Sequence, residues 1–263
     1  MRLATWNVNS IRSRIGRLEA WLGRADVDVL AIQETKTRPD QFPAARLEAL
    51  GYAVAHHGVN QWNGVAILSR VGLSDVTEGF CGMPRWGEPP VAEARALGAD
   101  CGGVRVWSLY VPNGRRIDDP HMDYKVSWLA ALRDAAAGWL AAAPESQVAL
   151  MGDWNIAPCD EDVWSMEFYA DKSHVSPRER AAFDAVVAAG YSDVVRPHTP
   201  GPGVYTYWDY QQLRFPKRQG MRIDFVLGSP ALTMRVEAAR IDREERKGTG
   251  ASDHAPVTVE LAD

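Results

Sequence analysis

The sequence predicts an α/β protein in which two β-sheets pack face to face with helices outside them. Short Val-, Ile- and Leu-rich segments bounded by turn residues recur along all 263 residues, whereas helical patterns are few. Closely spaced strands such as 52–55 and 64–68 are typical of β-hairpins. A doubly wound parallel sheet, the alternative, would require stricter alternation of strand and helix. No repeat or linker divides the chain, so residues 1–263 are predicted to form one domain.

The strand pattern begins at the first residues and continues to the end of the chain. The predicted strands are residues 3–8, 27–32, 52–55, 64–68, 103–111, 148–152, 204–208, 223–227, 234–241 and 255–261. Many of these segments are rich in Val, Ile and Leu and have turn residues at their ends.

Four helices are predicted between these strands. Residues 11–22 place Ile11, Leu18 and Leu22 on one face at helical spacing. Residues 39–50 and 120–142 are the next two, and the second of them follows Asp119 and starts with a proline. The fourth starts at the capping box Ser176-Pro177-Arg178-Glu179 and ends near Gly190.

Composition excludes some classes of protein. Hydrophobic residues are 46% and charged residues 24% of the chain, as in ordinary soluble globular proteins. Cys81, Cys101 and Cys159 form no CxxC pair, so we expect neither a disulfide framework nor a thiolate zinc site. A metal, if bound, would then have oxygen ligands. The first residues carry no signal-peptide pattern and no apolar run is long enough to cross a bilayer, so we expect a cytoplasmic monomer without a membrane partner.

The net charge of −5 counts against a nucleic-acid partner, because binding to phosphates is largely electrostatic. Net charge does not fix local charge, however. An acidic metal cluster inside a basic rim would give the same total.

Acids, amides and a histidine follow predicted strands or precede them at several places. The segments are Trp6-Asn7-Val8-Asn9, Gln33-Glu34-Thr35-Lys36, Gly152-Asp153-Trp154-Asn155, Arg222-Ile223-Asp224 and Ser252-Asp253-His254. Each one alone is also typical of turn formers and solvated loops. Together they supply the hard oxygen ligands that suit Mg²⁺ or Mn²⁺, with an imidazole beside them. They indicate an oxygen-ligated metal hydrolase.

The same segments, with one addition at 109–114, form an ordered set that spans nearly the whole chain. The motifs are ATWNVNSIR at 4–12, AIQETK at 31–36, LYVPNG at 109–114, GDWNIA at 152–157, RID at 222–224 and SDHAP at 252–256. In order and spacing this set resembles the exonuclease III family of abasic-site endonucleases. The resemblance implies a four-layer α/β sandwich, with two mixed β-sheets packed face to face and flanked by helices. It also implies an active site at one end of that sandwich.

The resemblance implies a metal site for Mg²⁺, with Mn²⁺ possible, and one or two ions. Glu34 is implied as the principal carboxylate and Asn7 as its neighbour, through a direct or water-mediated contact. Asn9 stands where many relatives carry Asp or Asn, so here that position contributes no charge. The full implied set of metal-site residues is Asn7, Glu34, Asp153, Asn155, Asp253 and His254.

Five residues acquire catalytic roles from the resemblance. Asp153 is implied to position or deprotonate the attacking water, and Asn155 to orient that water and contact the phosphate. His254 is implied to contact the scissile phosphate, with Asp224 pairing with it and fixing its tautomer. Tyr110 is implied to donate to the phosphate or to stabilise the leaving oxygen.

DNA contacts are implied at two kinds of position. Tyr207, Trp208 and Met221 would wall a pocket for a flipped, base-free sugar, and the alternative is that these side chains belong to the core. The implied phosphate contacts are Arg12, Arg14, Asn113, Arg115, Arg116, Lys125 and the basic loop 214–218.

The resemblance thus implies a DNA repair nuclease that hydrolyses the phosphodiester 5′ to an abasic site in duplex DNA. Removal of 3′-blocking groups and a 3′→5′ exonuclease activity would accompany it. One alternative is another enzyme of the same superfold, such as an inositol phosphate phosphatase or a sphingomyelinase. Another is a DNA-binding protein without catalysis, which the intact Glu34, Asp153 and His254 argue against.

Overall fold

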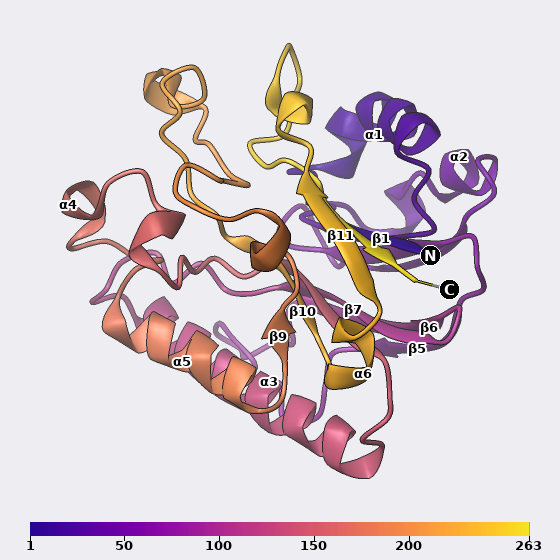
Figure 1. Ribbon diagram of the computed structural model, residues 1–263, viewed down its shortest axis with the longest axis horizontal. Coiled ribbons are helices and arrows are strands. Elements are labelled where there is room, and N and C mark those ends of the chain that lie inside the picture. The colour runs from indigo at the N-terminus through magenta and orange to yellow at the C-terminus, as the bar shows by residue number, and fades with distance from the viewer. Residues whose placement is uncertain (263) are drawn as a thin grey trace.

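The computed structural model describes residues 1–262, and these form two six-stranded sheets that pack face to face (Figure 1). The first sheet has the order β11 (Val236–Ile241), β12 (Val257–Leu261), β1 (Arg2–Asn7), β2 (Val29–Gln33), β4 (Val65–Ser69), β3 (Ala53–His57). The second has the order β5 (Ser74–Glu78), β6 (Ala96–Cys101), β7 (Val104–Tyr110), β8 (Val148–Asp153), β10 (Asp224–Gly228), β9 (Ser192–Asp193). Each sheet contains one parallel pair, β1–β2 and β7–β8, so both are mixed. The predicted α/β sandwich is confirmed.

Helices cover the outer face of each sheet. The α-helices are α1 (Ile11–Ala25), α2 (Ala44–Glu48), α3 (Pro120–Ala142), α4 (Met166–Tyr169), α5 (Pro177–Ala188) and α6 (Pro230–Thr233). Figure 1 shows α1 and α2 on one side of the molecule and α3 and α5 on the other. No helix within residues 1–262 has both the length and the apolar character that crossing a membrane requires.

Alternation of side chains along the central strands explains their uninterrupted apolar sequences. In β2, Val29 and Ala31 pack into the core between the two sheets, whereas Leu30 and Ile32 pack into the layer beneath α1. Successive residues of a strand point to opposite faces, so a strand covered on both sides must be apolar at every position. Complete burial of each such side chain stabilises the fold by roughly 1.5–3 kcal/mol.

Two predicted elements differ from the structure. Residues 204–208 do not form a strand, and Tyr207 makes only isolated bridges to Met221 and His254. Residues 39–50 do not form one helix. A 3₁₀ turn, Pro39–Gln41, and α2 are separated at Phe42, whose backbone is extended. Pro43 causes this break, since a proline disfavours helical geometry in the residue before it.

Strands β5, β6 and β9 were missed. All of β5 is exposed, so its sequence lacks the apolar alternation that marks a strand. In β6 the sequence ALGADC contains small residues with weak strand preference, although five of its six residues are buried. Strand β9 has only two residues.

Candidate active site

Strand pairing brings the predicted site residues together at one end of the sandwich. Asn7 ends β1 opposite Gln33, and Glu34 follows directly. In the second sheet Tyr110 lies opposite Asp153, and Asp153 lies opposite Asp224. The registers of these strand pairs thus align residues that are up to 71 positions apart in the chain, Asp153 and Asp224.

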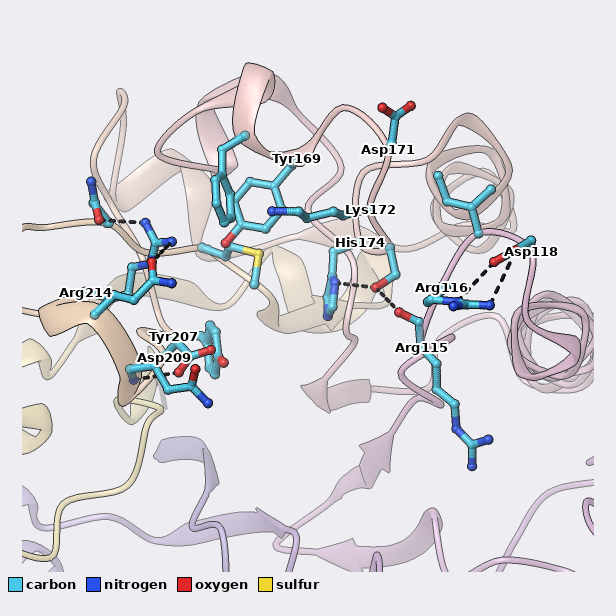
Figure 2. Close-up of a pocket in the computed structure, with 17 residues that line it drawn as sticks. Arg115, Arg116, Asp118, Tyr169, Asp171, Lys172, His174, Tyr207, Asp209 and Arg214 are labelled. Atoms are coloured by element: carbon cyan, nitrogen blue, oxygen red, sulfur yellow. Dashed lines mark hydrogen bonds and ion pairs between the residues drawn. The ribbon is translucent and has the colours of Figure 1, made fainter.

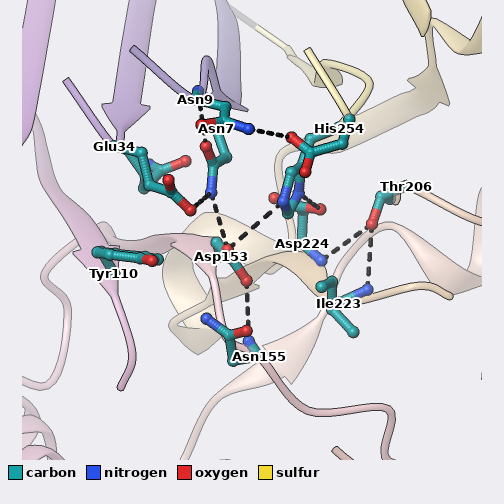
Figure 3. A network of polar contacts seen from close by, with 12 residues as sticks. Asn7, Asn9, Glu34, Tyr110, Asp153, Asn155, Thr206, Ile223, Asp224 and His254 are labelled. Carbon is teal, nitrogen blue, oxygen red and sulfur yellow. Dashed lines mark hydrogen bonds and ion pairs between the residues drawn. The ribbon is translucent and has the colours of Figure 1, made fainter. Parts of the chain in front are cut away.

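Asp153 lies at the centre of the polar network (Figure 3). Its Oδ2 accepts from Asn7 Nδ2 at 2.9 Å, and the same amide group donates to Glu34 Oε1 at 2.9 Å. Its Oδ1 accepts from the Asn155 backbone N–H at 2.9 Å. Burial, together with the charges of Asp224 and Glu34, raises the pKa of Asp153 to about 7 against the opposing charge of His254.

His254 lies against two carboxylates. Its Nδ1 is 2.8 Å from Asp224 Oδ2, and its Nε2 is 3.7 Å from Asp153 Oδ2. Burial alone would lower the pKa of His254, but the charges of Asp224 and Asp153 outweigh it and raise the pKa to about 10. The contact between Asp224 and His254 that the sequence predicted is therefore present, and it fixes which ring nitrogen faces the cavity. Thr206, which was not predicted, accepts the backbone N–H of Asp224 on its Oγ1 at 3.1 Å.

Asn155 belongs to a group of three loop side chains. Its Oδ1 accepts from Asn113 Nδ2 at 3.0 Å and faces His174 Nε2 at 3.1 Å, while its Nδ2 donates to the Val111 carbonyl at 3.0 Å. Burial and the Lys125 charge lower the pKa of His174 to about 4, so this imidazole is neutral at pH 7. No motif in the sequence marks His174, which is a single histidine in a loop.

Oxygen and nitrogen atoms of Glu34, Asp153 and His254 lie within 4.8 Å of one another, close enough to surround one cation. The two carboxylates fit a hard divalent ion. Asp224 binds one nitrogen of His254 and favours its protonated form, so the carboxylates are the better ligands. Glu34 Oε2 is also 2.6 Å from Lys36 Nζ, an ion pair that the sequence did not predict.

The other predicted metal-site residues lie nearby. Glu34, Asp153 and His254 line a cavity of about 290 Å³, the catalytic cavity, and Asp253 lines it as well. The Oδ1 of Asp253 accepts a hydrogen bond from Asn9 Nδ2 at 3.0 Å. Asn7 is fully buried, and its Oδ1 accepts from the Asn9 backbone N–H. The oxygen of Asn155 faces Asn113 and His174 instead of the Glu34 cluster.

Tyr110 lines the catalytic cavity from β7. Burial, reinforced by the neighbouring charge of Glu34, holds the pKa of Tyr110 well above its ordinary value. The Arg95 guanidinium lies 4.8 Å from the centre of its ring. The phenol therefore remains protonated and can donate a hydrogen bond into the cavity.

A larger cavity of about 800 Å³ adjoins the catalytic one (Figure 2). His174, Tyr207 and Met221 line both cavities. Arg115 lines the larger cavity and Asn113 the smaller. The predicted contact Arg12 is exposed on the first turn of α1 and lines neither cavity.

Two predicted DNA contacts are corrected by the structure. Lys125 is fully buried, and its ammonium group donates to the Asn155 carbonyl at 2.6 Å and to Glu179 at 2.5 Å, so it does not reach a phosphate. Trp208 is only 1% exposed and packs against Tyr205 and Phe215, so it belongs to the core and does not wall the pocket.

Comparisons with known proteins agree with this geometry. Residues 4–254 match the model of the endonuclease/exonuclease/phosphatase family. Exodeoxyribonuclease III of Haemophilus influenzae is 30% identical, over 99% of this chain and all of the relative. The solved structure of the Neisseria 3′ phosphatase NExo, bound to a product DNA hairpin, is 36% identical with a TM-score of 0.93, covering both chains entirely. An AP endonuclease from Archaeoglobus fulgidus is 32% identical with a TM-score of 0.92, covering 99% of each chain.

The family model matches almost the whole chain, and the relatives are similar along their full lengths. The order of motifs in the sequence had predicted the same relationship. The chain belongs to the exonuclease III branch of the endonuclease/exonuclease/phosphatase family.

Proposed function

We propose that this DNA repair nuclease uses Mg²⁺, or Mn²⁺ in its place, to hydrolyse the phosphodiester 5′ to an abasic site in duplex DNA. One observation carries the proposal. The buried carboxylate of Asp153 contacts Asn7 and Asn155 and faces the Asp224–His254 pair across a cavity that Tyr110 also lines. In this arrangement Asp153 can act as a base toward water, and His254 places positive charge near a phosphate. Tyr110 can donate a hydrogen bond to a leaving oxygen.

Asp153 is the proposed base for the attacking water. A carboxylate whose pKa is raised to about 7 can take up a proton near neutral pH better than an ordinary aspartate can. The Asn155 N–H holds one carboxylate oxygen, which leaves Oδ2 toward Asn7 and the cavity. The proton of the water therefore has an acceptor in a fixed orientation.

His254 and Tyr110 are proposed to act on the phosphate ester. The raised pKa of His254 keeps the imidazole positively charged beside Asp224, and a fixed positive charge stabilises the charge that develops on phosphate oxygens. The protonated phenol of Tyr110 can donate to the phosphate or to the leaving oxygen.

Glu34 and Asp153, with Asn7 beside them, are the proposed metal-site residues, and Asp253 would complete the acidic rim. A divalent ion bound there would supply Lewis acidity and neutralise phosphate charge. Lys36 supplies a further positive charge at this place, because its ammonium group pairs with the Glu34 carboxylate.

The larger cavity is the proposed DNA surface. Its lining has four cationic side chains, Arg115, Arg116, Lys172 and Arg214, against three acidic ones, Asp118, Asp171 and Asp209. The local charge is therefore slightly positive, which favours phosphates more than the net charge of −5 suggests. Tyr207 and Met221 lie where this cavity meets the catalytic one, and they are the proposed apolar wall for a base-free sugar. Exposed Arg12 remains a proposed phosphate contact.

Removal of a 3′ phosphate from a DNA end is a second candidate activity. The similarity to the Neisseria 3′ phosphatase, at 36% identity over both full chains, favours it. The same base, charge and donor would hydrolyse a terminal phosphate ester, because both reactions expel a 3′-oxygen and differ only in whether the phosphorus carries a second sugar. A 3′→5′ exonuclease activity would use the same site on undamaged ends.

An incision assay separates these activities. End-labelled duplexes that carry one stable abasic analogue, one 3′ phosphate or no damage are incubated with the protein and Mg²⁺, Mn²⁺ or a chelator. A metal-dependent cut 5′ to the abasic analogue supports the main proposal. Loss of the 3′ phosphate with an intact abasic duplex would replace the main proposal with the second one. If none of the duplexes reacted with either metal, both would be wrong.

A further inference from the structure

A buried ion pair lies directly beneath the catalytic loops. It joins Lys125 of α3 to Glu179 of α5 at 2.5 Å, and both side chains are fully buried. Isolated charges are very unfavourable in a protein interior, so a pair in this position must be compensated by further hydrogen bonds. Those hydrogen bonds all lead to the candidate active site.

Lys125 joins two loops through backbone carbonyls. Its Nζ donates to the Asn155 carbonyl at 2.6 Å and to the Asn113 carbonyl at 3.3 Å, with Glu179 as its third partner. An ammonium group has three protons, so its hydrogen-bonding capacity is fully used. The loop after β7 and the loop after β8 are therefore fixed to the same atom.

Glu179 fixes a third loop. Its two oxygens accept from the His174 backbone N–H at 2.9 and 3.0 Å, and Oε2 accepts from the Ser176 hydroxyl at 2.6 Å. The capping box at the start of α5 thus ties the segment that carries His174 to Lys125.

The three loops present their side chains to one another at the cavity. Asn113 donates to Asn155, and His174 faces the same Asn155 oxygen. Asn155 has φ 52° and His174 has φ 84°, left-handed conformations that cost free energy in residues with a side chain. Such conformations persist only when the surroundings hold them, and the ion pair supplies contacts to both residues.

We propose that Lys125 and Glu179 are positioning residues for the reaction, which set the orientation of Asn155 and His174 relative to Asp153. The proposal rests on the proposed function, because it assigns the ion pair a part in hydrolysis of DNA phosphate esters. Neither side chain touches the substrate. Their contribution is to keep the Asn155 carboxamide in the place where it faces the cavity.

The test compares Lys125→Met, which removes the ammonium group and keeps the length, with Leu132→Ala as a matched control. Leu132 is a fully buried residue of the same helix that packs in the α3–α5 layer.

Both variants should melt at lower temperature than the wild type. At a temperature where all are folded, Lys125→Met should lower kcat by about 10- to 100-fold, since small displacements at a reacting centre have effects of this size. KM should change by less than about threefold, because the cationic cavity is unchanged. Leu132→Ala should keep the wild-type kcat.

A readout without DNA distinguishes this proposal from the proposed function. The ¹H–¹⁵N signals of the Asn155 carboxamide and the His174 amide should shift or broaden in Lys125→Met and stay in place in Leu132→Ala. If the wild type cleaves no DNA but these signals respond, the proposed function fails and the positioning contact stands. Unchanged signals and kcat in folded Lys125→Met would overturn the positioning role, as would an equal loss of kcat in Leu132→Ala.

If Lys125→Met does not fold, two further variants apply the same test. Glu179→Gln keeps acceptor and donor atoms near Ser176 and His174 but removes the negative charge. The double variant Lys125→Met/Glu179→Gln leaves no unpaired buried charge, so it should fold. A folded double variant with wild-type kcat would overturn the proposal, and one with the 10- to 100-fold loss would support it.

Discussion

Asp153 shows how burial changes the chemistry of one side chain. It is 1% exposed and lies near Glu34 and Asp224, so its ionised form is less favourable than that of an aspartate in water. The hydrogen bonds from Asn7 and Asn155 and the charge of His254 act in the opposite direction. The result is a carboxylate suited to proton transfer near neutral pH.

Replacing Asp153→Asn removes the proposed base and keeps the shape of the side chain. We expect hydrolysis of the abasic duplex to fall by roughly 10²- to 10⁴-fold, the usual contribution of a positioned base. Binding of uncleaved DNA, measured by fluorescence anisotropy, should remain close to wild type. The melting temperature should not fall, because the variant relieves repulsion with Glu34 and Asp224. Equal losses of binding and hydrolysis would indicate that Asp153 organises the site without acting as a base.

Two adjacent aromatic residues should differ in what their substitution changes. Tyr207 lines both cavities, and its ring centre is 4.9 Å from that of His254, whereas Trp208 is buried with no partner for its indole nitrogen. We expect Tyr207→Leu to lower kcat/KM for the abasic duplex by roughly 10-fold or more, equivalent to about 1.4 kcal/mol. Trp208→Phe should instead lower the free energy of unfolding by about 0.5–3 kcal/mol and leave kcat/KM unchanged. Steady-state kinetics and chemical denaturation of both variants check this, and the reverse pattern would contradict it.

At the scale of elements, strand register and helix caps position the site. β7, β8 and β10 align Tyr110, Asp153 and Asp224 side by side, so no flexible loop is needed to bring these three together. Helix α3 contributes Lys125 beneath the site, and its start is fixed by Asp119, whose Oδ1 accepts the His121 backbone N–H at 2.8 Å. Long helices and strands therefore hold the reacting groups more rigidly than the loops could alone.

Replacing Asp119→Ala removes this cap, and we expect the free energy of unfolding to fall by about 1 kcal/mol. The matched control is Asp118→Ala, since Asp118 makes only an exposed ion pair with Arg116 that should contribute little. Urea denaturation of the two variants and the wild type gives the comparison. Equal stability of the two variants would show that the cap does not stabilise α3.

At the scale of the whole molecule, buried histidines should give stability a maximum near pH 6.5–7 in the presence of a chelator. Burial lowers the pKa of His56, His121 and His174 to about 4, so between pH 6.5 and 4 the unfolded chain binds protons that the folded chain does not. Stability should therefore fall as the pH decreases through this window. The raised pKa of Asp153, about 7, has the opposite effect, because the folded chain binds this proton in the same window. The effect of the three histidines is larger, since they account for three protons and Asp153 for one.

Above pH 6.5, His254 reverses the direction in which stability changes with pH. Its pKa is raised to about 10 by Asp224 and Asp153, against the effect of burial, so the folded protein keeps a proton that the unfolded chain has lost. Stability should then fall as the pH rises from 6.5 toward 10. Chemical denaturation between pH 4.5 and 9.5 measures both limbs, and His121→Gln should flatten the acid limb. A profile that is flat, or that rises toward acid pH, would contradict the prediction.

Local patterns in the sequence were enough for most of the architecture, and the ordered motifs contain the residues that the structure gathers around Asp153. The apolar strand segments, the cap of α3 and the capping box of α5 reappear where the sequence predicted them, because these depend on neighbouring residues along the chain. The ordered motifs also indicated the family. The exposed β5 and the Ala- and Gly-containing β6 carry weak local signals, since their pairing partners make them strands.

Only the tertiary structure decided which polar and aromatic residues face the cavity. By itself the sequence determined that Lys125 is charged and Trp208 is large and apolar, and both properties suit a DNA surface as well as an interior. Packing of α3 against α5 buries the lysine beside Glu179, and packing of the 205–215 segment buries the tryptophan. The same packing brings His174 to Asn155, 19 residues away in the chain. Burial is a property of many distant contacts together, so residue type and spacing along the chain do not determine it.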